Sequence, residues 1–471
     1  MKRILSILLC VALLLACQPT PDHEIIVNKG DGIAEDRIFA APDASAAPNA
    51  EQPTAEQSDR FPTHWEADAS TENVTVTIDA DVIYPEGPCP VDRIENRVLT
   101  IADINSVITA MYPNMIGYLP VNDNTESCSK EVWERILEST VRGFAHEEAD
   151  GSITYLPWDG QNEAIQWARN GYRDAEEQEG RFSSASRLPE DFTSKSGALL
   201  LLDDGREIRV SINPQSLTVY EAHTQAWAQS SPPWDYATDT PITLHPAIQP
   251  ETARETAERF IEQIGLSGEL TFAGMEAACL ESKMEFGYVS QGYQVEFTRT
   301  GSYPARSFFL LASGLLLRFS EDTQYHSPIG LPETMLLYVT ENGVEWMKWE
   351  RPYQIKERLN ENVELLPFSE IEEIAIRYFQ IGHAWIEQPL YEGFLVSSAT
   401  LTVLPQRLKD DQGLVLMPVW VLQMDVYGTH KDRTIDTTVK PLYIDRPYLL
   451  LINAIDGSRV SLPMDIIWTE E

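Results

Sequence analysis

TARETAERFIEQIG, residues 252–265, predicts an amphipathic helix, and the fold can be worked out from it. Its apolar residues recur every three or four positions and so share one helical face: Ala253, Ala257, Phe260, Ile261 and Ile264. Thr252 and Glu255 have the spacing of a capping box, and Gly265 is a typical helix end. The stretch therefore indicates a helix that buries one side.

Strand-like segments follow this helix, and then the same order starts again. YQVEFTR, SFFLLASGLLLRFS and ETMLLYVTENGVEWMKWE read as strands, the last turning at Asn342-Gly343. SEIEEIAIRYFQIG (369–382) predicts a second helix, with Ser369 and Glu372 as its capping box and Gly382 as its end. Strands at 393–406, 413–428 and 448–463 follow, the last turning at Asp456-Gly457. A helix followed by an antiparallel meander, met twice, predicts an α+β fold rather than alternating βαβ units.

The region before residue 230 predicts a further α+β domain. VTVTIDADVIYP (74–85) alternates like a half-buried strand, and Thr100 with Asp103 marks the start of a helix. KEVWERILESTVRG (130–143) predicts a second helix, and 162–180 a third that Gly171 interrupts. Asp204-Gly205 turns a hairpin. Five prolines between 232 and 250 indicate a boundary, so we expect domains at 72–230, 248–365 and 366–471.

The N-terminus predicts export. Lys2 and Arg3 precede an apolar run from Ile4 to Ala16 that is too short for a comfortable membrane span. The run ends in Leu14-Leu15-Ala16-Cys17, which resembles the lipobox of bacterial lipoproteins. That resemblance implies cleavage after residue 16 and a lipid on the thiol of Cys17. Two acyl chains would hold the protein stably at a membrane.

The next 50 residues predict a flexible spacer. From Ala34 to Ser70 the chain is rich in Ala, Pro, Glu, Gln, Asp and Ser, with little apolar periodicity. We therefore expect a tether over 17–71, in which Ile25-Ile26-Val27 is the one strand-like part. Phe61 and Trp65, near its end, are expected to dock on the folded body.

Composition limits the partners. The 471 residues carry a formal net charge of −38, and removal of residues 1–16 makes the chain more acidic by two charges. Such a surface repels phosphate backbones, so no nucleic-acid partner is predicted. At 43% hydrophobic residues the chain is typical of globular proteins.

Two family resemblances concern the C-terminal part and the overall layout. MPVWVLQMDVYG and LLINAIDGSRV, between 417 and 460, resemble the ending of PepSY-type and YycH/YycI-type extracytoplasmic modules. Those modules inhibit or regulate partner proteins, and YycH-like ones restrain a sensor kinase. The start at CQPTP, the tether and the repeated modules resemble a family of uncharacterised lipoproteins from Gram-positive anaerobes. Neither resemblance supplies catalytic residues.

Motifs for catalysis or metal binding are weak. Ser127-Cys128-Ser129-Lys130, Lys195-Ser196-Gly197 and Ser211-Ile212-Asn213 contain the three elements of a penicillin-interacting serine enzyme, but in the wrong order. Capping of a helix by Ser127 or Ser129 is the simpler interpretation. His146 with Glu147, Glu148 and Asp150 is the nearest approach to a metal cluster, yet it reads as a hairpin turn. The sequence therefore predicts no enzyme activity, no metal and no cofactor.

The aromatic residues and cysteines leave alternatives open. Trp346 and Trp349 lie three apart and would face opposite sides of a strand, so one of them could be exposed for stacking on a sugar or peptide. Packing inside the sheet is the other interpretation, which also holds for Tyr353 and for a second group at Trp227, Trp234 and Tyr236. Cys89 and Cys128 could form a disulfide in an oxidising compartment or stay reduced.

These observations predict a lipid-anchored protein on the extracytoplasmic face of the cell membrane, without catalysis. Its expected work is binding and regulation of an envelope protein. Two alternatives remain: a solute-binding lipoprotein that feeds a transporter, and a cell-envelope hydrolase whose acids cannot be singled out among 73 Asp and Glu residues.

Overall fold

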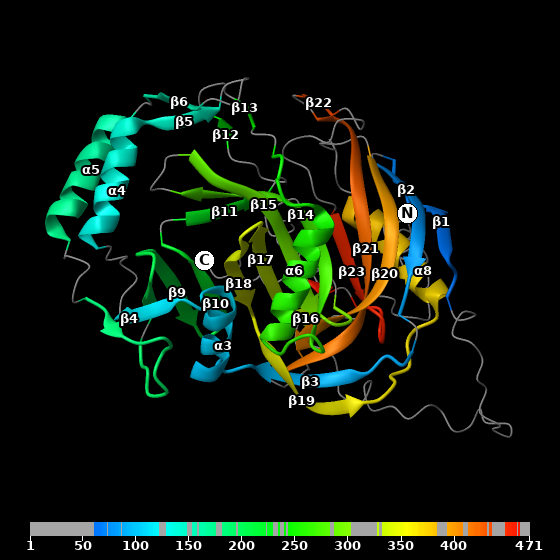
Figure 1. Ribbon diagram of the computed structural model, residues 1–471. Helices are drawn as coiled ribbons and strands as arrows, with labels where there is room; N and C mark the ends of the chain where they lie inside the picture. Colours follow the sequence, from blue (N-terminus) through cyan, green and yellow to red (C-terminus); the bar gives the residue numbers. More distant parts are fainter. Residues whose placement is uncertain are drawn as a thin grey trace, which may run out of the picture. The chain divides into compact units, whose positions relative to one another are not determined.

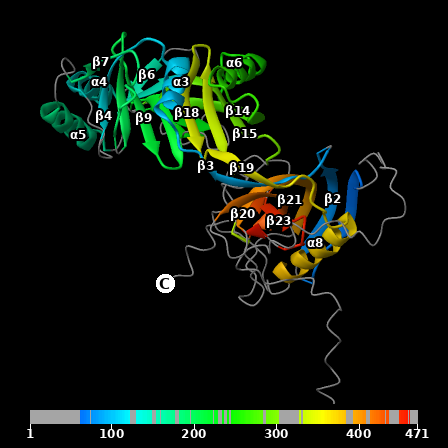
Figure 2. The ribbon, with the colours of Figure 1, turned by 90° about the horizontal axis from the view of Figure 1, so that it is seen from below.

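The computed structural model (Figures 1 and 2) describes most of the chain after residue 60. The described residues are 61–72, 74–85, 87–121, 129–147, 153–157, 160–175, 181–194, 196–222, 224–228, 234–235, 240–241, 244–282, 287–302, 327–328, 332–383, 393–407, 413–430, 433–435, 448–458 and 460–461. Contacts divide the chain into two compact units. Unit 1 is Met1–Arg93, Leu310–Gly330 and Glu357–Glu471, and unit 2 is Ile94–Phe309 and Leu331–Lys356.

None of the described helices combines the length and the apolar character that a membrane crossing requires.

Unit 1 is a mostly antiparallel sheet with one helix. Its eight described strands follow the order β1-β2-β20-β21-β3-β19, with β22 and β23 also paired to β21. The bounds are β1 His64–Asp68, β2 Thr75–Ile83, β3 Val91–Asn96, β19 Tyr353–Asn360, β20 Gly393–Arg407, β21 Leu414–His430, β22 Arg433–Ile435, β23 Tyr448–Asn453 and α8 Phe368–His383. A short parallel pair joins β16 (Ser327–Pro328) to β24 (Val460–Ser461). β3 and β19 run from one unit into the other.

The core of unit 1 lies between this sheet and α8. β2 alternates strictly between exposed and buried residues, as its sequence predicts. Its buried side chains, Val76, Ile78, Ala80 and Val82, pack with Ile371 and other residues of α8 in one cluster. The half-buried strand predicted at 74–85 is confirmed. Since alternate residues point to opposite faces, the outer face of β1 and β2 is polar.

Unit 2 contains a ten-stranded sheet among its described residues, in the order β11-β14-β15-β17-β18-β10-β9-β8-β4-β7, and every pair is antiparallel. The strands are β4 Met115–Val121, β7 Ser183–Ser184, β8 Gly197–Leu202, β9 Glu207–Asn213, β10 Ser216–Glu221, β11 Thr224–Ala228, β14 Leu270–Ser282, β15 Gly287–Arg299, β17 Thr334–Thr340 and β18 Gly343–Glu350. Two small hairpins pair β5 (Phe144–Glu147) with β6 (Ile153–Leu156) and β12 (Trp234–Asp235) with β13 (Thr240–Pro241). The helices are α3 Ile101–Met111, α4 Lys130–Arg142, α5 Gln161–Asp174 and α6 Pro250–Gln263.

The ten-stranded sheet consists of two similar halves. Helix α3 precedes the meander β4-β8-β9-β10, and helix α6 precedes the meander β14-β15-β17-β18. The last strands of the two meanders, β10 and β18, pair with each other and join the halves. Residues of α3 and α6 share one core cluster with the sheet, so both helices cover the same face. The predicted α+β class is confirmed, and the helix-plus-meander pattern occurs a third time, in the N-terminal half of unit 2.

The helix ends confirm some predicted caps and contradict others. The side chain of Thr100 accepts a hydrogen bond from the backbone N–H of Asp103, and the carboxylate of Asp103 accepts one from the backbone N–H of Thr100, which is the predicted capping box. The predicted box at Thr252 is wrong. α6 begins two residues earlier because Pro250 fits the first helical turn, where no N–H is needed. The box at Ser369 is also wrong, since α8 starts at Phe368.

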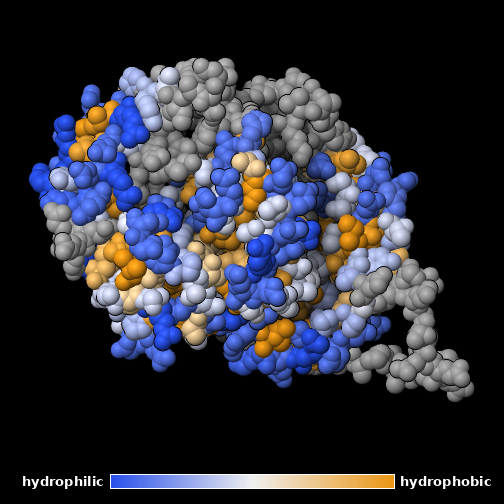
Figure 3. Space-filling model, in the orientation of Figure 1, coloured by the Kyte–Doolittle hydropathy of each residue, from blue (hydrophilic) through white to orange (hydrophobic). Residues whose placement is uncertain are grey.

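Helices α4 and α5 form a hairpin inserted between β4 and β8, and they pack on each other (Figure 1, upper left). Gly171 does not interrupt α5. A Cβ at this position would lie 2.4 Å from the ring of Trp133, so glycine allows the ring to lie against the helix. Hydrophobic groups are scattered over a largely hydrophilic surface at this end of unit 2 (Figure 3). Val141 of α4 is exposed.

The two units divide the chain differently from the three predicted domains. β2 pairs in parallel with β20, more than 300 residues later, so the first predicted strand belongs to the C-terminal module. The proline-rich stretch before residue 250 is not a boundary, because β11 before it pairs with β14 after it. The predicted tether also ends sooner than residue 71: β1 pairs with β2, and Phe61 and Trp65 are buried in the core of unit 1 as expected.

Candidate functional site

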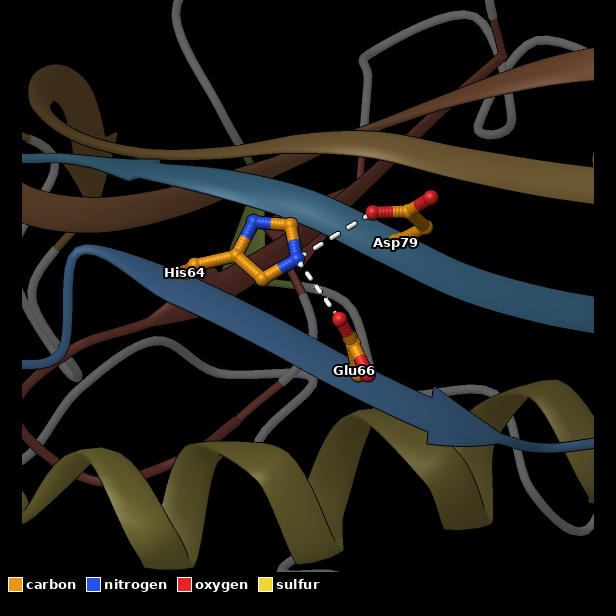
Figure 4. A group of neighbouring side chains, drawn as sticks. All are labelled: His64, Glu66 and Asp79. Carbon is orange, nitrogen blue, oxygen red and sulfur yellow. Dashed lines mark ion pairs between the residues drawn. The ribbon is translucent and has the colours of Figure 1, made fainter.

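A compact polar cluster lies on the exposed face of β1 and β2 (Figure 4). His64 and Glu66 are alternate residues of β1, and Asp79 and Asp81 are alternate residues of β2. The strand register places Glu66 opposite Asp79 and His64 opposite Asp81. Nε2 of His64 is 3.1 Å from Asp79 Oδ1 and 3.4 Å from Glu66 Oε1. Within the described part of the chain, this trio is the one whose donor atoms lie close enough together to share a metal ion.

The other ring nitrogen of His64 faces a third carboxylate. Nδ1 lies 3.6 Å from Asp81 Oδ1. The His64 side chain is 41% exposed and the three carboxylates are more exposed still. Among the described residues, every ion pair of these carboxylates is with His64. One imidazole is therefore shared by three carboxylates, and the negative charge of the cluster is not balanced.

A second polar cluster is a buried charge network inside unit 2. Arg299, at the end of β15, places Nη1 2.6 Å from Glu269 Oε2 and Nη2 2.5 Å from Glu333 Oε2. Arg97 continues the chain of charges, 3.4 Å from Glu269 and 3.2 Å from Asp103. The network thus ties the start of α3 to β14, β15 and β17.

Aromatic groups complete the surroundings of this network. Glu333 is fully buried and accepts a hydrogen bond of 2.8 Å from Nε1 of Trp349. The Arg299 guanidinium lies 4.5 Å from the centroid of the Tyr353 ring. Burial raises the pKa of Glu333 to about 7, and the attraction of Arg299 and the hydrogen bond from Trp349 reduce the effect only in part. A carboxyl that titrates near neutrality makes the stability of unit 2 depend on pH.

We expect this dependence to disappear in Glu333→Gln. The pKa of Glu333 is raised in the folded state above its ordinary value of 4.5. Unfolding above pH 4.5 therefore releases a proton, and the free energy of unfolding falls as pH rises towards 7. At 1.36 kcal/mol per pKa unit, the decrease would be about 3 kcal/mol relative to Glu333→Gln. Urea unfolding of both proteins at several pH values measures this decrease. If the free energy of unfolding changed with pH equally in both proteins, the raised pKa of Glu333 would be contradicted.

The third feature is the face of the ten-stranded sheet that α3 and α6 do not cover. On β10, β17 and β18, the residues turned to the helices are buried in the core: Leu217, Val219, Met335, Leu337, Met347 and Trp349. Most of their neighbours turned to the other face are half-buried, and we call these the central sheet face: Thr218, Tyr220, Leu336, Trp346, Lys348 and Glu350. Tyr338 lies on the same face beside Trp346 and is fully buried. Cross-strand pairing makes them contiguous, since Trp346 lies opposite Tyr220 and Lys348 opposite Thr218.

The prediction that Trp346 and Trp349 face opposite sides of one strand is confirmed, but Trp346 is half-buried and not exposed. Trp349 packs in the core while Trp346 lies on the opposite side, beside Tyr338. Tyr353 is buried, as the packing interpretation predicted. The side chains of the second aromatic group, Trp227, Trp234 and Tyr236, lie outside the described residues.

The predicted cysteine sites are tested only in part. Cys17 and Cys128 lie outside the described residues, so the lipid site and the Cys89–Cys128 bridge stay predictions. Cys89 is buried between β2 and β3; its N–H donates to Asn362 Oδ1 and its carbonyl accepts from Val363 N–H. The thiol of Cys279, also buried, is free.

Two of the three serine-enzyme elements are neighbours, since Gly197 pairs with Ser211 and the N–H of Ile212 donates to the carbonyl of Ser196, but the described part of the first element is the start of α4. Ser129 is the N-cap of α4 and accepts a hydrogen bond from the N–H of Val132, as the simpler interpretation predicted. Ser211 and Asn213 lie on β9, where Asn213 bonds to Ser216 across the turn to β10. Ser127 and Lys195 lie outside the described residues. His146 is on β5 opposite Thr154, as the hairpin interpretation predicted, and Glu148 and Asp150 are not described.

Comparison with known proteins adds two distant likenesses. No family model matches the sequence, and no curated protein matches it. An uncharacterized protein from Eubacterium rectale ATCC 33656, whose crystal structure is at 1.45 Å resolution, has a TM-score of 0.39 and 10% identity over 84% of this chain and 93% of that chain. The Bacillus megaterium YpeB C-terminal domain has a TM-score of 0.24 and 8% identity over 56% and 79%. Likeness at this level does not identify a function.

Proposed function

We propose that this protein is a lipid-anchored, extracytoplasmic lipoprotein that binds an envelope protein and regulates it. Cys17 would carry the lipid, and the polar segment before Phe61 would space the folded units from the membrane. The partner would bind at the central sheet face of unit 2. The proposal involves no catalysis by this chain.

The composition of the central sheet face carries the proposal. Trp346 and Tyr220 are adjacent, half-buried aromatics on paired strands. Lys348 lies beside them and forms a 2.9 Å ion pair with Glu350. Aromatic anchors bordered by charged groups are typical of protein interfaces, and tryptophan and tyrosine often contribute most of the binding energy. The helices α3 and α6 hold the opposite face, so this surface is presented on a rigid element.

Two further points support regulation over solute transport. The C-terminal segment resembles PepSY-type and YycH/YycI-type modules, which act on partner proteins. Solute-binding lipoproteins are built from alternating strands and helices, whereas almost all described strand pairs here are antiparallel. The transporter alternative therefore has less support.

Photocrosslinking in intact cells tests the proposal. A crosslinking amino acid at Lys348 is expected to capture one envelope protein when Cys17 is present, and to lose it in Cys17→Ser. The same group at Arg259, on the outer side of α6, is the control position. Equal capture from both positions, or capture that is unchanged by Cys17→Ser, would count against the proposal.

Binding of the captured partner gives a quantitative prediction. We expect Trp346→Ala to weaken binding about 30-fold or more, because truncation of an interface hot spot costs at least about 2 kcal/mol. Trp167→Ala is the matched control, since Trp167 is 51% exposed on α5 and outside the central sheet face. A loss of affinity in the control alone would place the interface elsewhere.

A further inference from the structure

We propose that His64, Glu66 and Asp79 bind one zinc ion on the exposed face of β1 and β2. The proposal does not depend on the partner-binding function. It concerns a site that the sequence does not predict, because β1 and β2 bring together residues 15 positions apart.

The two distances from the His64 nitrogen match the edges of a tetrahedral zinc site, and the three donor atoms lie within 4.8 Å of one another. Zinc binds histidine nitrogen and carboxylate oxygen at about 2.0–2.2 Å, and ligand atoms at the corners of such a tetrahedron are ~3.4 Å apart. Nε2 of His64 lies 3.1 Å from Asp79 Oδ1 and 3.4 Å from Glu66 Oε1. One nitrogen and two oxygens would thus take three corners, and the fourth would remain open to water.

The surroundings of the imidazole agree with a metal ligand. A zinc-bound histidine usually directs its other ring nitrogen at a carboxylate, a backbone carbonyl or water, which fixes the ring and its tautomer. Asp81 occupies that place, 3.6 Å from Nδ1, and a small movement would bring it into hydrogen-bond range. Asp81 is thus a positioning residue, and Figure 4 shows the His64 ring between strands, with Nε2 directed at Glu66 and Asp79.

The chemistry of the donors favours zinc over calcium. Calcium takes six to eight oxygen ligands at about 2.3–2.6 Å, whereas this cluster offers a nitrogen and few oxygens. Charge adds to the attraction, because three carboxylates share one imidazole. A zinc ion would also connect β1, an edge strand, to β2.

Isothermal titration of Zn²⁺ into the metal-free, full-length protein tests the site. We expect one ion per chain, with affinity at least about 10-fold lower in His64→Gln and in Asp79→Asn. Asp81→Asn should lose about 10-fold to 100-fold, as loss of an outer-shell partner typically does. His245→Gln is the control, since His245 is exposed and lies outside the cluster. The variants change exposed side chains, and circular dichroism checks that they fold.

Hydrogen exchange supplies a second readout. Zn²⁺ should slow exchange of the amides of β1 several-fold in the wild type and not in His64→Gln. Diffuse binding to the acidic surface would instead give several weak sites, unchanged by His64→Gln and equally occupied by Ca²⁺. That result, or equal affinities of His64→Gln and His245→Gln, would overturn the proposal.

Discussion

Replacement of Arg299 by methionine is expected to lower the free energy of unfolding of unit 2 by about 3–5 kcal/mol. Arg299 is 7% exposed and neutralises Glu333, which is fully buried. Methionine removes the positive charge and leaves the carboxyl in an apolar site. Loss of one partner of a buried ion pair is costly because the remaining carboxyl has neither solvent nor a counter-ion, and it must take up a proton to stay buried. Urea unfolding, with the transition of unit 2 followed separately from that of unit 1, measures the loss.

Two control variants separate the charge effect from simple loss of packing. In Arg299→Met/Glu333→Gln the carboxyl is gone, while the amide can still accept the hydrogen bond from Trp349, so most of the lost stability should return. Arg97→Met should cost about 1 kcal/mol or less, because Arg97 and its partner Glu269 are partly exposed. The single variant should also recover at acidic pH, where Glu333 is protonated. A double variant as unstable as Arg299→Met would contradict the charge explanation.

This network could not have been predicted from the sequence. Arg97, Glu269, Arg299 and Glu333 are spread over more than 230 residues, and each of them looks like an ordinary surface charge in its local context. Only the strand order, in which β17 lies beside β15, brings Glu333 to Arg299. Local patterns predict which face of an element is buried. They do not identify which elements become neighbours.

Helix caps, strand alternation and hairpin turns, by contrast, can be predicted from the sequence. The Thr100–Asp103 box, the alternation of β2 and the turn at Asp204-Gly205 depend on residues a few positions apart, and the sequence predicts all three. The α+β class follows from them. The parallel pairing of β2 with β20 depends on residues hundreds of positions apart, so the domain limits based on sequence order differ from the two units. The candidate metal site was not predicted for the same reason, because only the pairing of β1 with β2 brings His64 close to Asp79.

Replacement of Trp420 by alanine is expected to lower the free energy of unfolding of unit 1 by about 3–5 kcal/mol. Trp420 is fully buried on β21. Its ring packs edge-on against Phe368 of α8, with centroids 4.9 Å apart, and against Phe61, at 5.3 Å. Alanine would leave a cavity where the helix, the sheet and the N-terminal segment meet, and such a rigid site can collapse only in part. Chemical unfolding of unit 1 measures the effect.

Chemical unfolding of a second variant, Phe61→Ala, tests where the predicted tether ends. Phe61 also packs against Tyr84, with centroids 5.1 Å apart, and is 7% exposed. If residues 61–68 belong to unit 1, Phe61→Ala should destabilise it by several kcal/mol, while Trp420→Phe should restore much of what alanine loses. A flexible tether that extended to residue 71 would make Phe61→Ala nearly neutral, within about 0.5 kcal/mol. The two outcomes differ by far more than the error of an unfolding curve, so this variant decides whether β1, which carries His64 and Glu66, is a fixed part of the fold.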